Sequence, residues 1–105
     1  LQLMAQTGKL VKISELDMGY VNNAGTTLKT SQLTDRQHRA MADYYEFIVS
    51  SYLEIVPPAQ QYGITQWCPP DSPDNSFWRA GEPVGLWDAN YNRKYTYAGF
   101  ANGLN

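Results

Sequence analysis

The chain has 105 residues, 43% of them hydrophobic, and a formal net charge of −2 at pH 7, which suits a small globular unit rather than a disordered segment. Its basic side chains form no dense patch and no apolar run reaches the roughly 18 residues of a membrane span, so we expect neither nucleic acid nor a membrane as partner. Cys68 is the one cysteine, which excludes an internal disulfide and a cysteine-rich metal site.

The first predicted element is the end of a helix. Residues 1–8 read LQLMAQTG, and Gly8 is the residue type that closes a helix. Because the sequence opens inside a helix, we expect the chain to be part of a larger domain.

Residues 10–18 form the first predicted strand, with two carboxylates near its end. Alternation places Glu15 and Asp17 on one face with Val11 and Ile13, and apolar residues on both faces are typical of a strand in a parallel sheet. Acids at the carboxyl ends of parallel barrel strands tend to be catalytic. A strand-end acid is also a common structural cap or ion-pair partner, so spacing alone leaves both interpretations open.

The next element is a long helix that begins after Thr34. Thr34 and Gln37 match a capping box, and Pro57 and Pro58 end the helix. Apolar residues recur at spacings of three and four, which predicts a core-facing stripe rather than a sugar-binding surface. The stripe consists of Met41, Tyr44, Tyr45, Ile48, Val49, Tyr52, Leu53 and Val56.

A second strand over 62–67, an irregular loop over 69–93 and a last helix over 94–104 complete the chain. Long loops in compact domains tend to be functional. Asp71, Asp74 and Asp88 in this loop lack the spacing of a calcium loop, so no metal is predicted. The order is that of a βαβα unit, and two strands do not bury a sheet, so the unit is incomplete as a domain.

Three segments resemble glycoside hydrolase family 10, the endo-β-1,4-xylanases. Residues 11–18 read VKISELDM and resemble the nucleophile strand, which usually ends in Thr-Glu-Leu-Asp. Residues 63–67 read GITQW and are followed by DS at 71–72 and WR at 78–79, similar to the eighth strand and its loop. Residues 85–97 read GLWDANYNRKYTY and are similar to the closing motif of the family. Together these segments span most of the chain in the family's order.

The resemblance implies an α/β fold, a (β/α)8 TIM barrel. Of that barrel, residues 1–105 form the C-terminal fragment of a single catalytic domain: strands seven and eight with their helices, and the tail of helix six. It also implies retaining endo-hydrolysis of β-1,4-xylosidic bonds in xylan, without a cofactor. Two alternatives remain: a non-catalytic carbohydrate-binding or scaffold barrel, and a clan relative acting on another β-linked glycan.

The resemblance also assigns roles to four residues. Glu15 matches the nucleophile and Asp17 the acid that supports it, while Trp67 and Trp78 match the tryptophans that wall the sugar site. Arg79 is a candidate substrate-binding residue, and pairing with a loop aspartate is the alternative for its side chain.

The sequence departs from the family pattern in the loop between the two tryptophans. Cys68, Pro69 and Pro70 replace glycine and small residues, and Phe77 replaces serine, which predicts a different loop path.

The family's general acid lies upstream, in an Asn-Glu pair on strand four, so the chain alone is expected to be inactive. Glu46 and Glu54, on the helix outside the barrel, do not substitute for it. Expected partners are xylan or xylo-oligosaccharides, together with the remaining N-terminal part of a barrel or a second copy of the chain. A polymeric substrate implies a secreted, periplasmic or cell-surface protein.

Overall fold

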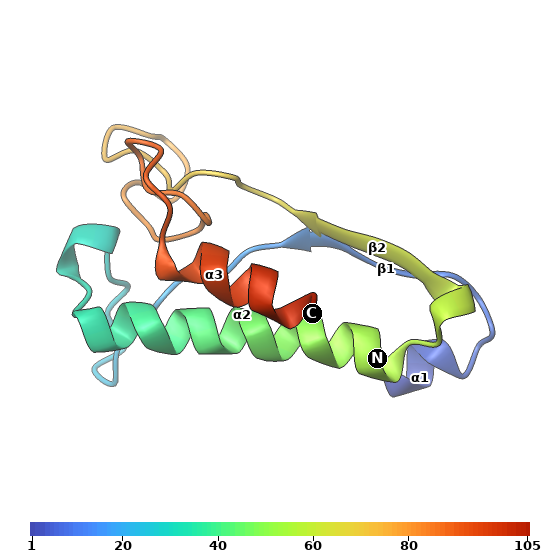
Figure 1. Ribbon diagram of the computed structural model, residues 1–105. Helices are drawn as coiled ribbons and strands as arrows, with labels where there is room; N and C mark the ends of the chain where they lie inside the picture. Colours follow the sequence, from blue (N-terminus) through green and yellow to red (C-terminus); the bar gives the residue numbers. More distant parts are fainter.

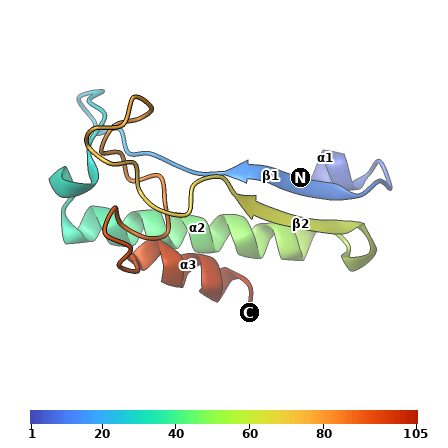
Figure 2. The same ribbon diagram turned by 90° about the horizontal axis from the view of Figure 1, so that it is seen from above.

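Two parallel strands and the helix that connects them organise the chain, which the computed structural model describes over residues 1–105 (Figure 1). β1 pairs with β2, and the helices α2 and α3 lie side by side against one face of this sheet (Figure 2). The elements in chain order are α1 (Gln2–Ala5), β1 (Val11–Leu16), the 3-10 turn η1 (Thr30–Gln32), α2 (Asp35–Ile55), the 3-10 turn η2 (Pro58–Gln60), β2 (Gln61–Gln66) and α3 (Tyr95–Gly103). The βαβα order predicted from the sequence is confirmed.

The connecting helix α2 begins as its capping box predicts. The Thr34 hydroxyl accepts a hydrogen bond from the Gln37 backbone N–H at 3.1 Å, and Gln37 Oε1 accepts one from the Thr34 N–H at 2.8 Å. The predicted stripe forms the core contact of this helix, except that Tyr44 is 58% exposed and lies outside it. Buried stripe residues are Met41, Tyr45, Val49, Tyr52 and Val56.

The face assignment predicted for β1 is wrong beyond Ile13. Val11 and Leu16 are both buried against α2, and Ile13 packs between them, although strict alternation places Leu16 on the other face. The cause is an irregularity in the ladder, since the register to β2 shifts between Ile13 and Leu16. Glu15 therefore lies on the face turned away from α2, because neighbouring strand residues point to opposite faces.

Close packing of α3 on α2 depends on two glycines. A Cβ atom at Gly99 would overlap the Ala42 backbone carbonyl, and one at Gly103 would lie 2.7 Å from Val49 Cβ. No helix of the structure has both the length and the apolar character to cross a membrane.

Candidate functional site

The carboxyl ends of β1 and β2 place Glu15 and Trp67 on the same face of the sheet. Leu16 pairs with Gln66 in the ladder, and the Trp67 N–H donates to the Leu16 carbonyl at 2.8 Å. Leu16 packs on Tyr45 of α2, and Gln66 Nε2 donates to the Tyr45 hydroxyl at 3.2 Å. The residues next to this pair, Glu15 and Trp67, therefore point to the opposite face, where both are exposed, Trp67 by 52%.

Gln66 fixes the chain where it leaves β2. Its Nε2 lies 3.2 Å from the Cys68 carbonyl and 3.1 Å from the Val84 carbonyl, in addition to its bond with Tyr45. Burial raises the pKa of Tyr45 to about 12, so this hydroxyl stays protonated at neutral pH. The bond from Gln66 to Cys68 thus fixes the backbone on either side of Trp67. Sequence reasoning missed this role of Gln66.

Arg79 joins the segment after β2 that carries Trp78, here called the tryptophan loop (residues 67–82), to the end of β1. Its Nη1 lies 3.3 Å from Asp17 Oδ2 and its Nη2 lies 3.2 Å from Glu82 Oε1. Its guanidinium carbon lies 5.3 Å from the centre of the Trp78 ring, within cation–π range. Burial opposes the charge of Arg79, but the hydrogen bonds and charges of Glu82 and Asp17 outweigh it and raise the guanidinium pKa. Arg79 is therefore ion-paired, and its partners are Asp17 and Glu82 rather than a loop aspartate.

Trp78 sits on a loop closed by two serine hydroxyls. Ser72 Oγ and Ser76 Oγ donate to the Trp78 carbonyl at 2.7 and 2.9 Å, and the Trp78 N–H donates back to Ser76 Oγ at 3.1 Å. These bonds fix the backbone while the Trp78 side chain stays 36% exposed. The neighbouring Phe77 is fully exposed.

A buried ion pair anchors this loop to the start of α3. Asp71 and Lys94 have side chains only 2% and 7% exposed, and Lys94 Nζ lies 2.7 Å from Asp71 Oδ1. The carboxylate also accepts bonds from the Gly85 N–H at 3.0 Å and from the Thr30 hydroxyl at 2.8 Å. Burial lowers the pKa of Lys94, although Asp71 opposes that shift. Sequence reasoning placed Asp71 in a family-like segment and rejected it as a calcium ligand, but missed its partner.

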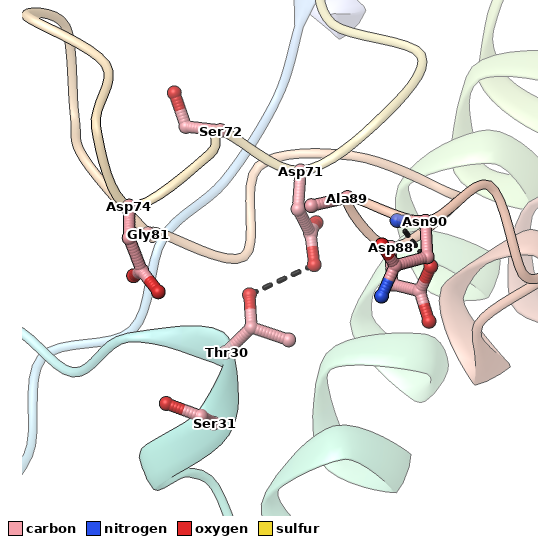
Figure 3. A pocket seen from close by; sticks show the side chains of 9 residues that line it. All are labelled: Thr30, Ser31, Asp71, Ser72, Asp74, Gly81, Asp88, Ala89 and Asn90. Carbon is pink, nitrogen blue, oxygen red and sulfur yellow. Dashed lines mark hydrogen bonds between the residues drawn. The ribbon is translucent and has the colours of Figure 1, made fainter.

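A polar pocket of about 200 Å³ lies beside this anchor, between the loop and η1 (Figure 3). Two of its three carboxylates serve the fold: Asp71 turns toward Thr30, and Asp88 accepts from the backbone N–H groups of Asn90 and Asn92, both at 2.9 Å. No group of three or more histidine, cysteine or acidic side chains is arranged to hold a metal ion. None of the predicted site residues lines the pocket, so the candidate site remains the strand ends. The lining residues are Thr30, Ser31, Asp71, Ser72, Asp74, Gly81, Asp88, Ala89 and Asn90.

The strand ends combine an exposed carboxylate with aromatic faces. Aromatic rings pack against the C–H faces of pyranose sugars, and a carboxylate can attack or stabilise an anomeric carbon. Retaining glycoside hydrolysis needs a second carboxyl group roughly 5 to 5.5 Å from the first. Glu46 and Glu54 are exposed on α2, which covers the face of the sheet opposite to Glu15, so neither is placed for that role.

Comparisons with known proteins point to one family. A model described as glycosyl hydrolase family 10 matches residues 1–103. The endo-beta-1,4-xylanase Xyn10C of Cellvibrio japonicus is 35% identical over 112 residues, covering 92% of this chain and 18% of that protein. The chain thus spans about a fifth of the length of this relative.

Solved structures agree in fold. Native xylanase 10C from Cellvibrio japonicus matches with a TM-score of 0.80 at 31% identity, covering 98% of this chain and 24% of that one. A mutant of that enzyme, in complex with xylopentaose, matches with the same TM-score and identity over 22% of its chain. Native xylanase 10B from Thermotoga maritima, at 21% identity, has a TM-score of 0.68 and covers 95% of this chain and 28% of that one, a likeness of fold alone. The two-stranded unit is part of a TIM barrel, and the chain belongs to glycosyl hydrolase family 10.

Proposed function

We propose that residues 1–105 supply strands seven and eight, with their helices, to a (β/α)8 barrel that cleaves β-1,4-xylosidic bonds of xylan with retention. Glu15 is the nucleophile in this proposal. The observation that carries it is the placement of Glu15 and Trp67 on one exposed face at the carboxyl ends of adjacent parallel strands. That edge is where TIM-barrel enzymes place their reactive groups.

Glu15 attacks in its ionised form in this proposal. A nucleophilic carboxylate must be ionised, and an apolar pocket would oppose that charge. Asp17, two residues later, is held by Arg79 and supports the polar surroundings of Glu15. The general acid that protonates the leaving oxygen comes from another strand of the barrel, so the chain by itself does not hydrolyse xylan.

Trp67 and Trp78 bind the xylose rings in this proposal. Trp67 is exposed on the face that carries Glu15, and Trp78 is linked through Arg79 to Asp17. The complex of the related Cellvibrio japonicus enzyme with xylopentaose supports a xylo-oligosaccharide as ligand. Arg79 orders Trp78 here rather than binding the sugar itself, since its donors are engaged by two carboxylates.

The rest of the barrel, or a second copy of the chain, covers the apolar side chains that this unit leaves exposed. Leu10 and Tyr62, at the starts of the two strands, are 63% and 65% exposed, and Leu3 and Phe47, on α1 and α2, are 80% and 66% exposed. Such a concentration of large apolar groups is typical of a protein interface. A polymeric substrate further places the enzyme outside the cytoplasm.

The test is xylan hydrolysis by residues 1–105 joined to the remaining strands of a family 10 barrel, native against Glu15→Ala. We expect the variant to lose about three orders of magnitude or more in kcat, and added azide to restore turnover by replacing the missing carboxylate. Glu54→Ala, on the opposite side of the sheet, is the matched control and should keep native activity.

Two results would sink the proposal. If the native barrel binds xylo-oligosaccharides but neither form cuts xylan, the chain belongs to a carbohydrate-binding barrel. If Glu15→Ala retains native turnover, Glu15 is a structural acid.

A further inference from the structure

We propose that Glu82 is a positioning residue of the xylan site: it holds Arg79 against Trp78 and Asp17 and thereby fixes the tryptophan loop relative to the end of β1. This inference rests on the proposed function. It concerns a residue outside the three family-like motifs, so the resemblance assigns Glu82 no role.

The first support is the division of the guanidinium between two carboxylates. Glu82 Oε1 accepts from Arg79 Nε at 3.3 Å and from Nη2 at 3.2 Å, which occupies one edge of the guanidinium. Nη1 is then left for Asp17 Oδ2 at 3.3 Å. The side chains of Arg79, Asp17 and Glu82 are 27%, 24% and 18% exposed, so water screens these contacts only in part.

The second support is the fit of this cluster against the chain that follows β1. A Cβ atom at Gly19 would overlap Arg79 Nη2 and would lie 3.1 Å from Glu82 Oε1. The guanidinium is therefore seated on the backbone of Gly19, with the Trp78 ring 5.3 Å from its central carbon. Loss of this seat frees the guanidinium to move relative to the Trp78 ring, whereas Asp17 keeps its own contact with Nη1.

The third support is the backbone of Arg79. Its φ of 47° is left-handed, a conformation that costs a non-glycine residue free energy and persists only when its surroundings hold it. The Glu82 N–H donates to the Arg79 carbonyl at 3.0 Å, so the same residue closes the turn and pairs with the side chain. The backbone of Glu82 thus closes the turn at Arg79, and its carboxylate holds the side chain of the same residue.

The consequence is a separation of binding from chemistry. Without the carboxylate of Glu82, Arg79 keeps only Asp17, so its guanidinium is no longer fixed over the Trp78 ring. Because Trp78 acts on the bound sugar and not on the reacting atoms, substrate binding weakens while turnover is preserved. A Glu82→Gln variant should raise the KM for xylopentaose about three- to tenfold, with kcat changed by less than about twofold.

The experiment compares Glu82→Gln, Arg79→Met and their double variant in the complete barrel, with Glu54→Gln as a matched loss of charge. If Glu82 acts through Arg79, adding Glu82→Gln to Arg79→Met changes KM by less than about 1.5-fold. Gly19→Ala is an independent variant that displaces the guanidinium from the other side, and it should raise KM in the same range. It also keeps the test decisive should the Glu82 variant fail to fold.

An unchanged KM in Glu82→Gln, or the same KM increase on both backgrounds, overturns the proposal. If the native barrel does not cut xylan, the proposed function fails, and the same variants are compared by their Kd for xylopentaose. The positioning role is then upheld, independently of catalysis, if Glu82→Gln raises this Kd only when Arg79 is present.

Discussion

The buried pair of Asp71 and Lys94 makes a quantitative prediction about stability. Asp71→Asn keeps the size of the side chain but removes its charge. The Lys94 ammonium then remains in a site where its side chain is 7% exposed, with only neutral acceptors: the Gly85 carbonyl at 3.1 Å and the amide oxygen of the new side chain. Removing one partner of a buried ion pair costs about 3–5 kcal/mol, because the other charge is left uncompensated.

A double-mutant cycle separates that penalty from the value of the pair. In Asp71→Asn/Lys94→Met neither charge is buried, so we expect the double variant to lose less free energy of unfolding than the sum of the single losses. The measurement is urea unfolding of the complete barrel at pH 7, followed by tryptophan fluorescence, with unchanged denaturant slopes as the sign of a comparable transition. The reasoning is refuted if Asp71→Asn costs under about 1 kcal/mol, or if the two single losses add.

Three further outcomes follow from the packing. Tyr52→Phe removes a hydroxyl that donates to the Val11 carbonyl at 2.6 Å and accepts from the Gly63 N–H at 3.0 Å, so it should cost about 1–3 kcal/mol in urea unfolding; a neutral variant would contradict this. Thr34→Ala removes the cap of α2 and should cost about 1 kcal/mol, and Thr34→Asn should restore most of it. Burial raises the pKa of the Cys68 thiol, and a thiolate is the reactive form, so the rate of iodoacetamide labelling should rise with pH through an inflection above the ordinary value of a free thiol. A labelling rate that has already reached its plateau at neutral pH would contradict that shift.

The sequence by itself determined the elements and most of their bounds. The capping box at Thr34, the stripe of α2 and the prolines at 57 and 58 are local signals, and the helix follows them. The second strand and the last helix are also confirmed to within a residue or two at their ends. These features depend on contacts between residues that are close in sequence. The spacings of three and four residues in a helix and of two in a strand therefore predict them directly.

The tertiary structure decided which way the functional side chains point and what holds them. Glu15 is turned from α2 by a register shift that belongs to the pairing of β1 with β2, and alternation within β1 alone predicts the opposite partition. Arg79 finds Asp17 across the fold, and Lys94 finds Asp71 from 23 residues away. The identity of such partners depends on where a long loop returns to the strand ends, and no periodicity in the sequence records that distance. The sequence therefore predicts the candidate residue types and the local elements, whereas the arrangement of the site arises from long-range packing.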